Sequence, residues 1–508
     1  MPESSSIDIP SPTLLVFLSS ASLMTVELVG GRIMAEHLGG SLYCWTSVVG
    51  SALAGVTLGG VLGGQMADRK PAGELLWLLF CLSSLLTLAI LPLEMFVGAQ
   101  GLFNQMKRPL RVLIGAPVLL LPAAISLACI PPVAAKVAIA RAPLKGRTVG
   151  RLYAFGSLGS IVGTLLTGFL LVSLMGTRSL LCVVAALLGV VCLFLGDRLS
   201  SAFLGAWSAS ALGLAAILYQ GTILAGDDFT RESNYYRIRV SLDEEETLKT
   251  LYLDNLAHSI IHPGQPDTLA YEYEQIFALL TERAFQGASA QTLTMGAGGY
   301  AFPRYLVHLH PNWEVHVVEI DPLVTRVAHQ QLGLPEDTPI LTFHSDARRF
   351  LAEMDPEQKY DLIYGDAFNS FSIPWHLTTK QFHDILKTHL DPQGVYLANV
   401  IDLYRSAKFL GAYVNTLKAS FPHVRVFSTQ EVGEESGRDT FIVAASLAPF
   451  PLEGLLEETS QKATPLFLLE ERHVEEAIRR AGSILLTDSF APVDQCMAAM
   501  LWADNATD

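Results

Sequence analysis

The chain has 508 residues, half of them hydrophobic and only 16% charged, and this balance argues against an ordinary soluble enzyme and for a membrane protein. The first 225 residues carry 13 Lys and Arg against 8 Asp and Glu, so the remainder carries a net charge of −20. An acidic C-terminal half repels nucleic acid and permits a polycationic ligand.

Seven apolar runs in the first 225 residues are each long enough to cross a bilayer. We therefore expect residues 1–225 to form a multispan α-helical membrane bundle in contact with lipid. Glycines crowd the second and fifth runs, which predicts close helix packing there. The predicted spans are 13–34, 43–66, 75–97, 112–135, 153–175, 179–196 and 202–224.

The orientation of these spans is ambiguous. The distribution of Lys and Arg between the loops favours a cytoplasmic N-terminus, and seven spans would then export the C-terminal half. Either an eighth, less apolar span exists or the charge bias is misleading here, because the chemistry of the C-terminal half favours a cytoplasmic location. We expect a multi-pass protein of the cell (inner) membrane with its catalytic domain in the cytoplasm.

The pattern changes after the last apolar run. Residues 226–290 contain short β-rich runs and a linking helix, which predicts a small β subdomain, and residues 291–508 alternate strands with helices. That alternation predicts a mostly parallel, doubly wound α/β sheet of the Rossmann type. The six cysteines show neither CxxC nor His-rich spacing, so we expect no disulfide scaffold and no metal site.

The first strand of this sheet ends in a glycine-rich turn. Gly296, Gly298 and Gly299 let the backbone pass close to a ligand before a helix begins at about Pro303. The spacing differs from GxGxxG, and the turn has no Lys or Arg for a pyrophosphate. A nucleoside without phosphates, such as S-adenosylmethionine or a relative, fits better than a dinucleotide.

Carboxylates follow the next three strands. Glu319 ends the second strand, where it can accept hydrogen bonds from ribose hydroxyls. Asp346 ends the third, where an adenine amino group could donate to it, and Asp366 ends the fourth. Each single acid could instead be a helix N-cap. Three on successive strand ends favour a shared site.

These residues fall within a pattern that resembles the polyamine aminopropyltransferase (spermidine synthase) family, and the multispan N-terminal half resembles its membrane-fused branch. The fold of that family is similar to that of S-adenosylmethionine methyltransferases. The resemblance covers residues 235–400. Its motifs are LYLDNLAHS (251–259), DTLAYEYEQIF (267–277), MGAGGYAFPR (295–304), VEIDP (318–322), HSDARRF (344–350), YDLIYGDAFNSFSIPWHLTT (360–379) and GVYLANV (394–400).

The resemblance implies an enzyme that transfers the aminopropyl group of decarboxylated S-adenosylmethionine, a co-substrate, to putrescine or a related amine. No permanently bound cofactor is implied, and a homodimer is left open. Asp366 would accept the proton and Tyr271 would position the amine. The donor would bind Tyr236, Gly296, Gly298, Glu319, Asp346, Ala347 and Pro374, and the amine would bind His258, Tyr271, Glu272, Asp366 and Asn369.

Two acids of the family pattern are absent. Gly299 stands where an acid usually holds the ammonium of the donor, and Asn369 stands where a second acid is expected. Glu272, Asp254 and Asp267 are the nearest substitutes by sequence. Tyr236 and His258 stand where glutamines are common.

Two other functions compete with aminopropyl transfer. An S-adenosylmethionine-dependent amine methyltransferase is favoured by Gly299, because an acid there would repel the carboxylate of intact methionine. A transporter or sensor that binds a polyamine without turnover draws on the glycine-rich spans and on Glu27 within the first span. Asp366 and Tyr271 argue against it, because binding alone needs no proton acceptor.

Overall fold

The structure is a computed structural model that describes residues 11–97, 106–195, 227–243, 247–367, 373–433, 437–451 and 466–502. The chain divides into two compact units, Met1–Gly226 and Asp227–Asp508.

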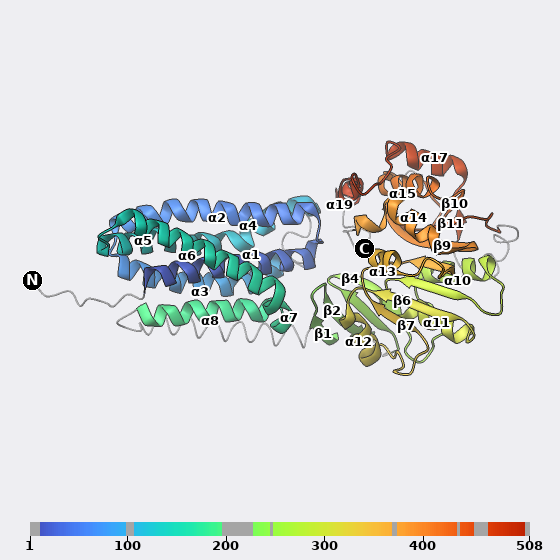
Figure 1. Ribbon diagram of the computed structural model, residues 1–508, viewed down its shortest axis with the longest axis horizontal. Helices are drawn as coiled ribbons and strands as arrows, with labels where there is room; N and C mark the ends of the chain where they lie inside the picture. The colour runs from blue at the N-terminus through green and yellow to red at the C-terminus, as the bar shows by residue number, and fades with distance from the viewer. Residues whose placement is uncertain are drawn as a thin grey trace, which may run out of the picture. The chain divides into compact units, whose positions relative to one another are not determined.

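The first unit is helical (Figure 1). Among its described residues, six helical stretches are long and apolar enough to cross a membrane, judged by length and composition, and they coincide with the first six predicted spans. The seventh, at 202–224, lies outside the described residues. The helices are α1 (Pro12–Leu38), α2 (Leu42–Arg69), α3 (Ala72–Val97), α4 (Arg108–Ala128), α5 (Ile130–Arg141), α6 (Lys145–Leu166), a π-helical turn (Thr167–Leu171), α7 (Val172–Met175) and α8 (Thr177–Leu195).

Glycines permit close helix contacts in this unit, as the sequence predicts. A Cβ on Gly59 of α2 would lie 2.5 Å from the carbonyl oxygen of Ile125 in α4. A Cβ on Gly163 of α6 would lie 2.5 Å from the carbonyl oxygen of Ala21 in α1. Only glycine permits the two backbones to approach this closely. The resulting van der Waals contacts stabilise helix packing in lipid, where the hydrophobic effect does not drive helices together.

Two cross-links connect helices that are distant in sequence. Arg178 of α8 pairs with Glu36 of α1 at 3.2 Å and with Glu94 of α3 at 2.8 Å, and all three side chains are largely buried. A disulfide joins Cys81 of α3 to Cys192 of α8, which the cysteine spacing does not predict.

The second unit begins with a four-stranded antiparallel sheet, β1 (Asp227–Glu232), β2 (Arg237–Leu242), β3 (Lys249–Leu253) and β4 (Leu256–Ile261), in that order. Alternate residues of its strands, among them Ile238, Val240 and Leu251, are fully buried. They share a hydrophobic cluster with Ile276 and Phe277 of α10 (Glu272–Ala284). The small sheet is thereby fixed against the helix that leads into the main sheet.

The main sheet has eight strands in the order β12-β10-β11-β9-β8-β5-β6-β7. Neighbours from β9 to β7 pair in parallel, and β11, β10 and β12 continue the sheet with antiparallel pairs. The mostly parallel α/β sheet predicted from the sequence is present. Its strands are β5 (Gln291–Met295), β6 (Glu314–Glu319), β7 (Leu341–His344), β8 (Tyr360–Gly365), β9 (Leu390–Leu403), β10 (His423–Ser428), β11 (Arg438–Ser446) and β12 (Phe467–Leu468).

Helices cover both faces of this sheet (Figure 1). Successive strand residues point to opposite faces, so Leu362 and Ile363 of β8 belong to different hydrophobic clusters. The cluster around Leu362 includes α10, α11 (Ala301–Leu309) and α12 (Pro322–Gln331). The cluster around Ile363 includes α13 (Ala347–Glu353), α14 (Lys380–Thr388), α15 (Lys408–Lys418), α17 (Glu471–Arg480) and α18 (Val493–Cys496). A short 3₁₀ turn (Trp375–Leu377) and α19 (Ala498–Trp502) complete the described helical segments.

The chain order reverses between β5 and β8. From β5 the chain adds β6 and β7 on one side, then returns to place β8 on the other side of β5. A crevice forms at such a switch point beyond the carboxyl ends of the strands, which is where ligands bind in doubly wound sheets.

Candidate active site

A cavity of about 750 Å³ opens at this switch point, bounded by the carboxyl ends of β5, β6 and β8 and by β3 and β4 of the small sheet. It is large enough for a drug-sized ligand. All of the predicted site residues that the structure describes line it: Tyr236, His258, Tyr271, Glu272, Gly296, Gly298, Glu319, Asp346, Ala347, Asp366 and Pro374. Asn369 lies outside the described residues.

The glycine turn brings two strand ends together. Gly296 has φ +91°, and a Cβ on it would lie 2.4 Å from the carbonyl oxygen of Asp366. The backbone N–H of Asp366 donates to the carbonyl of Met295 at 2.9 Å. Glycine is therefore required at 296 both for its conformation and for the close approach of the segment that carries Asp366.

Glu319 ends β6 beneath this turn and is only 6% exposed. One carboxylate oxygen accepts from the backbone N–H of Ala297 and the other from that of Asp321, both at 2.9 Å. Burial raises the pKa of Glu319 to about 7 despite these bonds. Each oxygen keeps a second lone pair that can accept a ligand hydroxyl.

Asp346 has two roles in the structure. Its side chain caps α13 by accepting from the backbone N–H of Arg349 at 2.9 Å, so the N-cap interpretation is correct for this residue. Its other oxygen lies 2.7 Å from Nε2 of His376, and this contact lowers the pKa of Asp346. Because both Asp346 and His376 also line the cavity, capping does not remove the carboxylate from the site.

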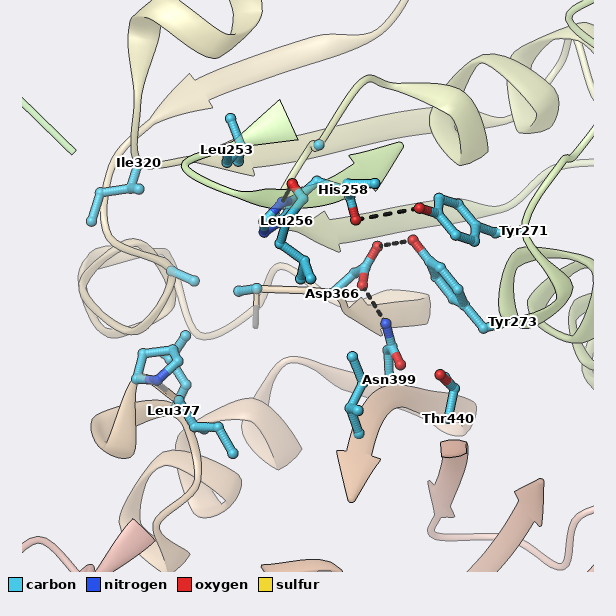
Figure 2. Close-up of a pocket in the computed structure, with 18 of the residues that line it drawn as sticks. Leu253, Leu256, His258, Tyr271, Tyr273, Ile320, Asp366, Leu377, Asn399 and Thr440 are labelled. Carbon is cyan, nitrogen blue, oxygen red and sulfur yellow. Dashed lines mark hydrogen bonds between the residues drawn. The ribbon is translucent and has the colours of Figure 1, made fainter. Parts of the chain in front are cut away.

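Asp366 follows β8 and is held at both oxygens (Figure 2). The hydroxyl of Tyr273 donates to Oδ2, and Nδ2 of Asn399 donates to Oδ1, each at 2.9 Å. Burial raises the pKa of Asp366 to about 6, and the two donors limit the rise. Such a carboxylate is mostly ionised at neutral pH and still takes a proton readily, as a general base must.

Tyr271 does not bond to Asp366. Its hydroxyl donates to the carbonyl of Ala257 at 3.3 Å, as Figure 2 shows, and its ring lies 5.7 Å from that of Tyr273. Tyr271 therefore lines the cavity without touching the carboxylate, and Tyr273 is the tyrosine in contact with Asp366.

Two of the acids named as substitutes for the missing pair are not in the cavity lining. Asp254, in the turn between β3 and β4, accepts from the backbone N–H of Arg237 in β2 and so holds that turn against β2, and Asp267 is exposed. Glu272 does line the cavity. Among the described residues, no group of three or more His, Cys, Asp or Glu side chains could hold a metal ion.

Tyr273 and Asn399 are the contacts that reasoning from the sequence missed. Asn399 lies in the predicted strand 394–400, next to β8 in the sheet, so its side chain could have been placed beside Asp366 once the strand order was known. Tyr273 lies two residues after Tyr271, at the start of α10. No feature of the sequence marked it as a residue of the site.

No protein-family model matches the chain. Curated relatives do. A probable polyamine aminopropyl transferase of Bifidobacterium longum is 29% identical over 227 residues, covering 41% of this chain and 48% of the relative. A polyamine aminopropyltransferase of Vibrio vulnificus is 28% identical over 219 residues, covering 41% of this chain and 71% of the relative.

A methyltransferase also matches. An N-terminal histidine N-methyltransferase of Emericella nidulans is 33% identical over 163 residues, covering 30% of this chain and 27% of the relative. The chain thus spans about half the length of the Bifidobacterium relative and about a quarter of the methyltransferase. The longer matches are to transferases of aminopropyl groups, so the matched part of this chain is similar in sequence to polyamine aminopropyltransferases.

Proposed function

We propose that this chain transfers the aminopropyl group of decarboxylated S-adenosylmethionine to putrescine or a similar amine, giving a spermidine-type product and methylthioadenosine. The observation that carries the proposal is Asp366, a carboxylate at the switch point whose pKa burial raises to about 6 and whose two oxygens are fixed by Tyr273 and Asn399. Binding without turnover would not require a base poised near neutral pH.

The donor occupies the side of the cavity formed by β5 and β6. Glu319 accepts the ribose hydroxyls, because both of its oxygens are oriented by backbone N–H groups and keep free lone pairs. Asp346 and the backbone of Ala347 meet the adenine, and Pro374 lines the thioadenosine pocket. The glycine turn at Gly296 and Gly298 lets the ligand approach the main chain.

The reaction needs a free amine, and a primary amine is protonated at neutral pH. Asp366 holds the ammonium and takes one of its protons. The nitrogen lone pair then forms a bond to the methylene next to the sulfonium, the C–S bond breaks, and its electron pair neutralises the sulfur as a thioether. Both reactants are cations, so the acids that line the cavity offset their repulsion.

The helical unit is proposed to span the cell membrane, with the C-terminal unit in the cytoplasm where its nucleoside donor is made available. Support comes from the length and apolar composition of its six described stretches. A reporter protein fused to the C-terminus that is active only in the cytoplasm is expected to be active. Inactivity of that fusion, with activity of a periplasmic reporter, would contradict the orientation.

Whether the chain forms a homodimer is a separate question. The mass of the detergent-solubilised protein distinguishes one chain from two.

Amine methylation is the second candidate. It is favoured by Gly299, which puts no acid in the turn, and by the similarity to a methyltransferase. Purified protein in detergent, given both the decarboxylated and the intact donor with putrescine, separates the two. The proposed function predicts an aminopropylated amine and methylthioadenosine. A gain of one methyl group with S-adenosylhomocysteine would establish the second candidate.

A further inference from the structure

A second, much smaller cavity lies behind the glycine turn. It borders the large one, since both are lined by His258, Tyr273, Gly296, Gly298 and Asp366. The space open to the centre of a water-sized group is about 10 Å³. A cavity of that size holds roughly one water molecule. An ammonium group has about the same size.

Three oxygen atoms of side chains that line this small cavity have no hydrogen-bond partner within the part of the chain that the structure describes. They are Oε2 of Glu274, Oγ of Ser259 and Oγ1 of Thr294. The three side chains are only 3%, 2% and 3% exposed. Buried polar atoms are nearly always satisfied, so three unsatisfied oxygens around one small cavity point to a missing polar group that hydrogen-bonds to them.

The neighbouring turn cannot supply the charge of the family pattern. A Cβ on Gly299 would lie 2.5 Å from Cδ1 of Ile261 and 2.8 Å from Oγ of Ser259. Any side chain at 299 would therefore displace Ser259 from the wall of the small cavity. Glycine at 299 therefore leaves Ser259 in place in the small cavity, which Glu274 also lines.

We propose that Glu274, Ser259 and Thr294 form a subsite for a primary alkylammonium group of the reacting pair, either the tail of the donor or the far end of the amine. The match is one of number and charge: an ammonium carries three N–H donors and a positive charge, and the subsite offers three acceptors and one carboxylate. This inference rests on the proposed function and extends it to the groups that fix the reactants in place.

The charges around the subsite agree with this assignment. Burial, and secondarily the nearby Asp366, raises the pKa of Glu274 well above its usual range. An entering ammonium would stabilise the ionised form of Glu274 and would shield Glu274 and Asp366 from one another.

Capping of α10 explains only part of Glu274. The backbone N–H of Tyr271, the N-cap of that helix, favours the ionised form of Glu274 and so opposes the rise in its pKa. A cap needs neither Ser259 nor Thr294, whose hydroxyl oxygens stay unsatisfied without a further donor.

The test compares Glu274→Gln with Glu282→Gln in the full-length protein. Glu282 lies on the same helix and lines neither cavity, so its variant controls for removal of a charge from α10. KM for the donor, KM for the amine and the Kd of methylthioadenosine, which has no ammonium, are measured for each. We expect Glu274→Gln to raise one KM by about 10- to 100-fold, the usual effect of losing a hydrogen bond to a charged group. The Kd of methylthioadenosine and the behaviour of Glu282→Gln should not change.

The results also separate the two sources of the ammonium. A rise in KM for the donor alone assigns the subsite to the donor tail, and a rise in KM for the amine alone assigns it to the amine. If neither KM changes, or if methylthioadenosine binding falls equally, the subsite is refuted while measured aminopropyl transfer keeps the proposed function. Absence of both transfer and methylthioadenosine binding in the unaltered protein refutes the proposed function instead.

Two further variants keep the test valid if Glu274→Gln does not fold. Ser259→Ala and Thr294→Val preserve shape and remove one acceptor each. Each is expected to raise the same KM several-fold without changing the Kd of methylthioadenosine. Unchanged KM values in both would refute the subsite.

Discussion

Replacing Asp366 with asparagine tests the proposed base with little change in shape. The amide oxygen of the new side chain can accept from Nδ2 of Asn399, and its NH₂ group can donate to the hydroxyl oxygen of Tyr273. Both contacts of the carboxylate therefore have a neutral equivalent. The variant loses the charge and the ability to take a proton, and keeps the local hydrogen bonds.

Two opposite effects follow. Turnover should fall by roughly 10²- to 10⁴-fold, the usual range for loss of a general base. Stability should rise, because the pKa of Asp366 is about 6 in the folded chain against 3.8 ordinarily. Because the folded pKa is the higher one, ionisation of this carboxyl destabilises the folded state. The destabilisation is absent below the unfolded pKa of 3.8 and complete above the folded pKa of about 6. Raising the pKa of this carboxyl from 3.8 to about 6 lowers the free energy of unfolding at pH 8 by at most about 3 kcal/mol.

The assay measures turnover at saturating substrates, the pH dependence of kcat/KM, and the thermal midpoint of the detergent-solubilised chain at pH 8 and pH 4. In the unaltered protein kcat/KM should fall as the pH drops through about 6, and Asp366→Asn should lack that fall. Its midpoint should exceed that of the unaltered protein at pH 8 more than at pH 4. Undiminished turnover, or the same fall near pH 6 in the variant, would remove Asp366 from the mechanism.

Three further substitutions test the surroundings of the base. Tyr273→Phe removes a donor that lowers the pKa of Asp366, so the acid limb of kcat/KM should move to higher pH; an unmoved limb would contradict the contact. Glu319→Gln places an NH₂ group against a backbone N–H, and should weaken methylthioadenosine binding by about 10- to 100-fold in calorimetry, whereas equal affinity would exclude Glu319 from the ribose site. Gly296→Ala should lower both the thermal midpoint and turnover, because its Cβ meets the backbone of Asp366; a variant as stable and active as the parent would show that the approach is not required.

Much of the fold could be predicted because its signals are local. Apolar runs of sufficient length mark the first six helical stretches, and the change to short alternating strands marks the second unit. The acids after β6, β7 and β8 were predicted to meet because parallel strands end at the same edge of a sheet. Glu319, Asp346 and Asp366 do line one cavity.

The parts that escaped prediction depend on contacts between distant segments. The contact of Tyr273 with Asp366 joins residues 93 positions apart, and that of Asn399 joins residues 33 apart. The small cavity behind the turn is formed by β4, α10 and β5 together, and no motif indicates that their oxygens converge. Asp254 and Asp267 are near the site in sequence but do not line the cavity. Asp254 is held by its bond to the backbone of Arg237, and Asp267 is exposed.

An experimental structure of the chain with methylthioadenosine tests the central claim most directly, since the claim is that one cavity rimmed by strand-end carboxylates holds the nucleoside of the donor beside the base. The account predicts the ribose hydroxyls on Glu319, the adenine next to Asp346, and the thioether facing Asp366 past the glycine turn. A nucleoside bound elsewhere, or bound here with its sulfur directed away from Asp366, would contradict it.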